Sequence, residues 1–280
     1  MTRHEIELAD GRRLVVHLTG PAAGSSLTLL WHHGSPQTGA VIAPIAAAAE
    51  ERGIRVLSVA RPSYGGSSPD PGLTVASAAR DLRAVLDALA VDHVVTMGAS
   101  GGGPHALACA AVMPERVRAA VAIASPSPYT GDPAWFEGMA APGGLQSALR
   151  GRDDRAAFAE TDQFDETQFV DVDWAALAGT WQDLGRDAAA ADADGPDGLI
   201  DDDVAFASPW GVELQDIEAP VLVVQGGRDR VIPAAHALRL VQLIPTAELW
   251  LRPGDGHVSV LDAVPPALDW LRDRVRSTLA

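Results

Sequence analysis

Short, almost wholly apolar runs alternate with amphipathic segments along most of this 280-residue chain. Residues 27–33 are typical of a strand that is buried on both faces of a sheet. Residues 74–89 carry apolar side chains at positions i, i+3, i+4 and i+7, which predicts an amphipathic helix with Thr74 as its N-cap. Because parallel strands are joined by crossover connections that usually hold a helix, this alternation predicts an α/β protein with a mostly parallel, twisted sheet flanked by helices.

The same patterns predict the order of the elements along the chain. The turn residues Asp10 and Gly11 separate two runs that we expect to form a hairpin, at 3–8 and 13–19. Further strands are expected at 27–33, 54–60, 93–99, 117–124, 220–225 and 247–251. Helices are expected at 39–52, 74–89, 102–113, 234–243 and 260–277.

Composition excludes several classes of protein. Apolar residues make up 47% of the chain and charged residues 21%, which is the mixture of an ordinary soluble globular protein. The one cysteine, Cys109, excludes an internal disulfide and a cysteine-based zinc site. A net charge of −16 argues against binding to nucleic acid, whose phosphates attract basic proteins. With neither a secretory signal nor an apolar run of about 20 residues, we expect a cytoplasmic protein that does not enter a membrane.

Residues 126–210, called the acidic segment below, differ in composition from the rest of the chain. They hold 18 of the 37 acidic residues, only four arginines and ten of the 14 aromatic residues. Such a shift predicts an inserted domain between two parts of a core domain, at 1–125 and 211–280. If its carboxylates face the entrance of a site, we expect cationic or neutral substrates to be favoured over anionic ones. If they face solvent, they serve only solubility.

Residues 98–102, Gly-Ala-Ser-Gly-Gly, follow the G-x-S-x-G pattern at a point where a predicted strand ends and a predicted helix begins. Ser100 would lie on a sharp turn, where side chains two residues before and two residues after it would collide. Glycine at Gly98 and Gly102 relieves that crowding. The turn would place the Ser100 hydroxyl at a helix N-terminus, where the dipole and free N–H groups favour a developing negative charge. The motif therefore indicates a nucleophilic serine.

Together with two further motifs, this turn gives the chain a resemblance to the α/β-hydrolase family over essentially its whole length. Residues 33–36, His-Gly-Ser-Pro, resemble the family's HGxP loop. Residues 61–67, Arg-Pro-Ser-Tyr-Gly-Gly-Ser, resemble its R-P-x-Y-G-x-S segment, although Ala60 stands where the family often has aspartate. The resemblance implies the α/β-hydrolase fold, with the acidic segment as an inserted helical cap that closes over the pocket and selects substrate.

The resemblance also implies the partners of the serine. In the family, an acid and then a histidine follow the nucleophile along the chain. His257 lies in a glycine-rich loop after the last predicted strand, where the family carries its base. Asp229 lies just past the strand at 220–225, in a segment that resembles the family's G-x-x-D, and is expected to orient the base. Asp255 is interpreted as a loop residue, because it is too close to His257 in sequence to orient it.

Two backbone N–H groups are expected to form the oxyanion hole, those of Ser35 and Gly101. The Ser35 hydroxyl is a second possible donor, and the sequence leaves that open. His32 and His33, in the same loop, are interpreted as structural residues.

Together these motifs predict a serine hydrolase that cleaves an ester-like acyl bond of a small molecule through an acyl-enzyme. The expected chemistry implies no cofactor. The aspartates between 192 and 203 are expected to form an acidic loop, and they fail the spacing of an EF-hand, because Pro196 and Asp197 occupy its fifth and sixth positions. We therefore expect no metal site.

The motifs leave other activities open. An aminopeptidase of the proline iminopeptidase type would use cap carboxylates to bind an amino group, although residues 33–36 depart from the H-G-G-P-G loop of that group. A cofactor-free peroxidase, a C–C hydrolase and a non-catalytic ligand-binding protein are further alternatives on the same fold. Serine at position 100 argues against epoxide hydrolases and haloalkane dehalogenases, which use aspartate there.

Overall fold

The computed structural model describes residues 1–20 and 27–278, and these contain an eight-stranded sheet with the order β1-β2-β4-β3-β5-β6-β7-β8. β1 pairs antiparallel with β2, and β2 with β4, whereas the other neighbouring strands are parallel. The predicted α/β class, with its N-terminal hairpin and mostly parallel sheet, is confirmed. The strands are β1 (Thr2–Glu7), β2 (Arg13–Thr19), β3 (Thr28–His32), β4 (Arg55–Val59), β5 (Val94–Ala99), β6 (Val117–Ile123), β7 (Val221–Gly226) and β8 (Ala247–Arg252).

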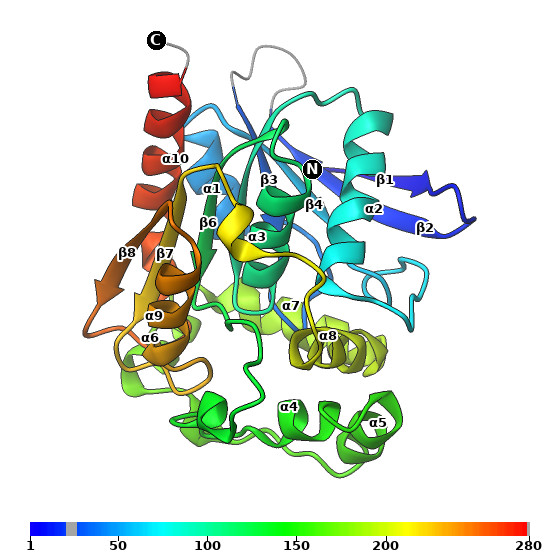
Figure 1. Cartoon of the computed structure of the whole chain (residues 1–280), viewed down its shortest axis with the longest axis vertical. Helices are drawn as coiled ribbons and strands as arrows, with labels where there is room; N and C mark the ends of the chain where they lie inside the picture. Colours follow the sequence, from blue (N-terminus) through cyan, green and yellow to red (C-terminus); the bar gives the residue numbers. More distant parts are fainter. Residues whose placement is uncertain (21–26, 279–280) are drawn as a thin grey trace.

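Helices cover both faces of this sheet (Figure 1). One face carries α2 (Val75–Ala88), α3 (Gly102–Val112) and α9 (Ala234–Leu243), and the other carries α1 (Ala43–Glu50) and α10 (Val264–Thr278). Leu30 packs in the core of the first face, and its neighbour Leu29 packs in the core of the second. Successive strand residues alternate between the faces, so a strand buried on both sides must be apolar almost throughout.

The first helix is shorter than predicted. The composition of residues 39–52 favours a helix throughout, but α1 begins only at Ala43. Gly39 has a φ of +85°, and a Cβ there would come within 2.4 Å of the Cα of Ala60. The chain at position 39 packs directly against the end of β4, so the backbone there cannot be helical and only glycine fits.

The acidic segment, all of which the structure describes, holds five α-helices between β6 and β7. In Figure 1, α4, α5, α7 and α8 lie together below the sheet, at the end of the molecule opposite the C-terminus. The helices are α4 (Gly143–Ala148), α5 (Arg152–Ala159), α6 (Asp171–Ala178), α7 (Gln182–Ala193) and α8 (Asp197–Ala207). Short 3-10 helices occur at Pro133–Phe136 and Glu166–Gln168. Beyond the segment, 3-10 helices occur at Leu214–Asp216 and Ser259–Ala263.

The predicted acidic loop at 192–203 is wrong at both ends, because Asp192 lies on α7 and α8 begins at Asp197. Asp201, Asp202 and Asp203 lie on α8 and are buried. Asp201 pairs with Arg152, Asp202 with Arg61 and Asp203 with Arg155, each at 2.7 Å. Buried carboxylates are tolerated when they are paired, and these three have their charge compensated inside the protein. They therefore contribute less to the potential at the surface than the sequence count implies.

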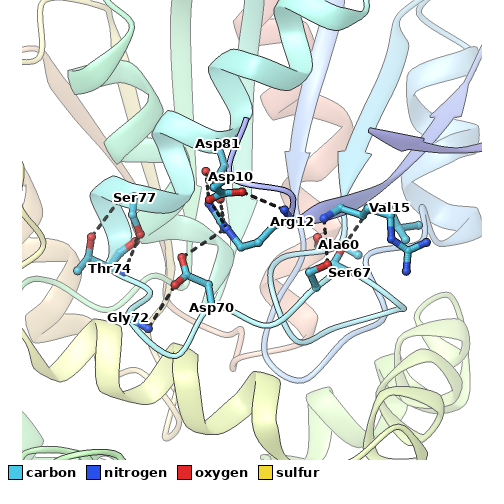
Figure 2. Close-up of polar contacts among 12 residues, drawn as sticks. Asp10, Arg12, Val15, Ala60, Ser67, Asp70, Gly72, Thr74, Ser77 and Asp81 are labelled. Carbon is cyan, nitrogen blue, oxygen red and sulfur yellow. Dashed lines mark hydrogen bonds and ion pairs between the residues drawn. The ribbon is translucent and has the colours of Figure 1, made fainter. Parts of the chain in front are cut away.

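An ion-pair cluster fixes the N-terminal hairpin to α2 (Figure 2). Arg12, in the hairpin turn, donates to both carboxylate oxygens of Asp81 on α2, at 2.7 and 2.9 Å, and contacts Asp70 at 3.3 Å. Beside it, Ser67 Oγ accepts a hydrogen bond from the N–H of Val15 in β2 (2.9 Å). These contacts hold the segment after β4, which carries the R-P-x-Y-G-x-S pattern, against the sheet.

No helix within residues 1–20 and 27–278 is both long and apolar enough to cross a bilayer. The longest of them, α10, has 15 residues, whereas a span needs about 20. The same part of the chain contains no group of three or more His, Cys, Asp or Glu side chains arranged to hold a metal ion.

Candidate active site

Ser100 lies on the turn between β5 and α3, in a backbone conformation that few residues adopt. Its φ is +52°, in the left-handed region, which for a residue other than glycine is often found at functional sites. A Cβ on Gly98 would come within 2.1 Å of the Gly102 carbonyl oxygen, and one on Gly102 within 2.1 Å of the His32 carbonyl oxygen. Both glycines of the motif are thus required by close backbone contacts, one across the turn and one with the end of β3.

The structure brings Ser100, His257 and Asp229 together from the loops after β5, β8 and β7. His257 Nε2 lies 2.9 Å from Ser100 Oγ, and His257 Nδ1 lies 2.8 Å from Asp229 Oδ2. Asp229 is buried, whereas the other two residues keep partial access to solvent. In this arrangement the imidazole can accept the serine proton while the carboxylate holds the ring with Nδ1 protonated. Asp255 contacts Arg252 instead.

Asp229 is itself held by the segment of chain that follows it. Its Oδ1 accepts the N–H groups of Val231 (2.8 Å) and Ile232 (2.9 Å), and Gln225 Nε2 donates to its Oδ2 (3.2 Å). Gln225 also donates to the Ile232 carbonyl (2.9 Å). These bonds fix the plane of the carboxylate, so that Oδ2 faces the imidazole of His257.

Two opposing effects act on the pKa of His257. Burial favours the neutral imidazole and lowers the pKa, but the charge and hydrogen bond of Asp229, together with the charge of Asp173, favour the protonated form more strongly. The pKa is therefore raised above the ordinary histidine value of about 6.5. A raised pKa makes the imidazole a stronger base than a free histidine.

The two predicted oxyanion donors lie side by side. A Cβ on Gly101 would come within 2.3 Å of Ser35 Oγ and within 3.1 Å of Phe206 Cζ. Among the described residues, neither the Gly101 N–H nor the Ser35 N–H has a hydrogen-bond partner. Both groups are free to bind an oxyanion. Phe206, on α8, adds an apolar wall at the same point.

The Ser35 hydroxyl is engaged in a buried ion pair. It donates to Asp202 Oδ2 (2.5 Å) and accepts from Arg61 Nη2 (3.0 Å). Arg61 donates further to the carbonyl oxygens of His33 (2.6 Å) and Gly34 (3.1 Å). The Arg61–Asp202 pair therefore fixes the backbone of the loop that carries the Ser35 N–H.

The other buried histidines of this region have structural contacts. His32 Nε2 lies 2.8 Å from Thr96 Oγ1, and burial lowers the pKa values of both His32 and His33, so that both are neutral. Burial also lowers the pKa of His236, to about 4. Both ring nitrogens of a further buried histidine, His105, lack a hydrogen-bond partner in the described part of the chain. Within that part of the chain, none of these four imidazoles hydrogen-bonds to Ser100, whereas that of His257 does.

Sequence reasoning missed the roles of Asp202 and Arg61. The R-P-x-Y-G-x-S pattern marks the position of Arg61 but says nothing of its partner, which lies 141 positions away. A usable signal for Asp202 was present, because it stands four residues before Phe206 in a run without proline and therefore shares a helix face with it.

Comparison with known proteins identifies the family. A model of the family described as "alpha/beta hydrolase fold" matches residues 28–264. A 2-hydroxy-6-oxononadienedioate/2-hydroxy-6-oxononatrienedioate hydrolase from Cupriavidus pinatubonensis is 29% identical over 254 residues, which cover 86% of this chain and 84% of that one. A 2-hydroxy-6-oxo-6-phenylhexa-2,4-dienoate hydrolase from Burkholderia cepacia is 27% identical over 264 residues, with 86% and 84% coverage.

A solved structure shares the fold over almost its whole length. The thermophilic esterase from Thermogutta terrifontis aligns with a TM-score of 0.72, covering 98% of this chain and 99% of that one at 22% sequence identity. That likeness shows the fold alone. The family model is more informative, because the residues it matches, 28–264, make up well over half of the chain. The chain therefore belongs to the α/β-hydrolase fold family.

Proposed function

We propose that this protein is a serine hydrolase in which Ser100 is the nucleophile, His257 the general base and Asp229 the residue that orients the base. The observation that carries the proposal is the line of hydrogen bonds from Ser100 Oγ to His257 Nε2 (2.9 Å) and from His257 Nδ1 to Asp229 (2.8 Å). A serine hydroxyl is a weak nucleophile unless a neighbouring base takes its proton. The hydrolase names of the curated relatives agree with this reaction class.

The proposed reaction is an acyl transfer to serine followed by hydrolysis. Ser100 Oγ attacks the carbonyl carbon of an ester-like substrate while His257 Nε2 takes the proton. The N–H groups of Gly101 and Ser35 stabilise the negative oxygen of the tetrahedral intermediate. His257 returns the proton to the leaving alcohol, and water, activated by the same imidazole, cleaves the acyl-enzyme.

We further propose that the acidic segment caps this site, over a core formed by residues 1–125 and 211–280. Its helix α8 places Phe206 beside Gly101, and its Asp202 bonds to Ser35. Its helix α6 contacts the loop of His257 through Asp173. A cap that touches both the loop of Ser35 and the loop of His257 shields the reaction from bulk water and limits the shape of the acyl group.

A second candidate is hydrolysis of a carbon–carbon bond. The names of the curated relatives describe oxo-dienoates and oxo-dienedioates, which contain no ester, so hydrolysis in those proteins breaks a bond between carbons. An oxo carbon is electrophilic, and the same nucleophile and oxyanion donors can act on it.

Charge favours the ester over these anionic compounds. Arg61 contacts the Ser35 loop, but its guanidinium is already bonded to Asp202 and to the carbonyl oxygens of His33 and Gly34. A substrate carboxylate would find no free cation at that position. Of the 18 acidic residues of the acidic segment, Asp173 and three of the aspartates on α8 are buried, and the other 14 still outnumber its four arginines. We therefore propose a neutral or cationic ester-like acyl compound as the substrate.

A fluorophosphonate probe and a substrate panel test the proposal. We expect mass spectrometry to find one phosphonyl adduct, on Ser100. The panel compares p-nitrophenyl esters, amino-acid anilides and 2-hydroxy-6-oxo-6-phenylhexa-2,4-dienoate. We expect kcat/KM for neutral esters to exceed that for matched esters with a terminal carboxylate by about tenfold, or 1.4 kcal/mol. A protein that is neither labelled nor active on any of the three classes would be a binding protein and not a serine hydrolase.

The pH dependence of ester hydrolysis follows from the pKa of His257. The base acts only when neutral, and its pKa is raised, so we expect kcat/KM to increase with pH through a midpoint above about 6.5. Asp229→Asn removes the charge that favours the imidazolium and should lower both the activity and the midpoint. A wild-type midpoint below 6 would be inconsistent with His257 as the base.

A further inference from the structure

Asp173, on α6, is completely buried and accepts hydrogen bonds from the loop that carries His257. Its Oδ1 accepts the N–H groups of Val258 (2.9 Å) and Ser259 (2.8 Å) and the Ser259 hydroxyl (2.8 Å). Its Oδ2 accepts the N–H groups of His257 (3.2 Å) and Val170 (3.1 Å). Three consecutive N–H groups of the base loop thus converge on one carboxylate, in the concave arrangement that binds anions.

The bonding of Asp173 differs from that of the other buried aspartates of the acidic segment. Asp201, Asp202 and Asp203 each pair with an arginine, whereas within the described residues Asp173 forms no ion pair with a charged side chain. Burying a carboxylate is costly unless charged or polar groups replace water around it. Here the N–H and hydroxyl groups of the base loop do so, with charge-assisted hydrogen bonds.

The glycine before His257 is required by this carboxylate. A Cβ on Gly256 would come within 2.0 Å of Asp173 Oδ2 and 2.6 Å of Val170 Cγ2. The N–H of Gly256 donates to Ser259 Oγ (2.8 Å), so the loop also closes on itself beside the carboxylate. Glycine is needed at 256 because α6 leaves no room for a side chain.

A role of Asp173 as a cap of its own helix, α6, does not account for these contacts. The bond from Val170 to Oδ2 is local and belongs to the first turn of α6. The three bonds to Oδ1 all come from residues 85 or 86 positions away. A carboxylate that served only α6 would have no need of these three donors.

We propose that Asp173 is a positioning residue, which holds the 256–259 loop so that His257 Nε2 stays within hydrogen-bond reach of Ser100 Oγ. This inference rests on the proposed function of His257 as the base. It also assigns a role to the acidic segment, because the segment's carboxylate fixes the base of the core domain. The charge of Asp173 acts on the imidazole in the same direction as that of Asp229, favouring the protonated form.

A second aspartate of the acidic segment makes comparable contacts with the loop that carries Ser35. Asp187, on α7, accepts the N–H (3.1 Å) and the hydroxyl (2.5 Å) of Thr38, and Gln37 Nε2 donates to it (3.3 Å). Gln37 Oε1 in turn accepts the N–H of Gly34, next to Ser35 (2.5 Å). Carboxylates of the acidic segment therefore bond to both the loop of Ser35 and the loop of His257.

Kinetics of Asp173→Ala and Asp173→Asn, with Asp203→Asn as the matched control, test the inference. Asp203 is also a buried aspartate of the acidic segment, but its partner Arg155 lies in the same segment. We expect Asp173→Ala to lower kcat for p-nitrophenyl esters by about 10²-fold with little change in KM, because a misplaced base slows chemistry more than binding. Asp173→Asn keeps one carbonyl acceptor and should show a smaller loss. Asp203→Asn should keep the wild-type kcat.

Amide hydrogen exchange supplies a readout that is independent of activity. We expect the amides of Val258 and Ser259 to exchange faster in Asp173→Ala than in the wild type, and to be unchanged in Asp203→Asn. If Asp173→Ala does not fold, Asp173→Asn carries both measurements.

Two outcomes would overturn the inference, and both differ from failure of the proposed function. Equal kcat in the Asp173 and Asp203 variants, or unchanged exchange at Val258 and Ser259, would show that Asp173 does not position the base loop. A wild-type protein that reacts neither with esters nor with the fluorophosphonate would instead refute the serine hydrolase, whatever the exchange rates show.

Discussion

Ser100→Ala is expected to lower kcat for activated esters by about 10⁶-fold, because the members of such a triad act as a unit. The protein is expected to stay folded. The described contact of the Ser100 hydroxyl is the one with His257, so its removal leaves no buried donor without a partner elsewhere. Alanine keeps the Cβ, so the strain of the positive φ at position 100 does not change. Circular dichroism and the midpoint of urea unfolding should therefore match the wild type.

Two histidine variants, His257→Ala and His236→Ala, provide the comparison for this prediction. His257→Ala should cost about as much activity as Ser100→Ala. His236→Ala removes another buried imidazole, one that contacts Ser127 instead, and should retain the wild-type kcat. Ester turnover that survives in Ser100→Ala at the wild-type rate would remove Ser100 from the mechanism.

Asp202→Ala should produce the largest loss of stability, about 3–5 kcal/mol, because it leaves the buried guanidinium of Arg61 without its counter-charge. That is a large part of the roughly 5–15 kcal/mol by which domains are usually stable. Urea unfolding measures the loss. Asp197→Ala, on the same helix, breaks an exposed pair with Arg152 and should cost less than about 1 kcal/mol.

The double variant Asp202→Leu with Arg61→Met separates an unpaired charge from a general loss of packing. Removing both charges should cost less stability than Asp202→Ala alone, since the largest penalty comes from the uncompensated ion. If Asp202→Ala and Asp197→Ala proved equally mild, the ion pair would not be a main support of the Ser35 loop.

The pH dependence of this stabilisation has a definite sign. Burial alone would raise the pKa of Asp202, but the charge and hydrogen bonds of Arg61, together with a contribution from His105, outweigh it and lower the pKa below its ordinary value. A lowered carboxyl pKa contributes stability that is fully present above about 3.9 and is lost as the pH falls through the folded-state value. The difference in unfolding free energy between wild type and Asp202→Asn should therefore be constant near neutrality and shrink only in strong acid.

The features that local patterns could predict are those set by neighbouring residues. The turn at Ser100 requires glycine two positions before it, because a Cβ on Gly98 would meet the Gly102 carbonyl oxygen across the turn. The glycine two positions after it is required by His32 at the end of β3, which is a tertiary contact. The late start of the first helix, at Ala43 instead of residue 39, could not be predicted from such patterns. It depends on the approach of Gly39 to Ala60, which are distant in sequence.

The sequence by itself determined the parallel sheet and the strand-to-helix turn, because periodicity and glycine spacing act over a few residues. Asp229 and His257 were predicted from the resemblance to the family and not from these local patterns. The sequence also identified the acidic segment, but not where its carboxylates point. Only the tertiary structure placed Asp173 on the loop of His257 and Asp202 on Arg61 and Ser35. A buried carboxylate is stable only where donors from other elements replace water around it, and those donors come from 84 to 167 positions away. For that reason composition suggests a charged surface where the folded chain has internal supports for the loops of Ser35 and His257.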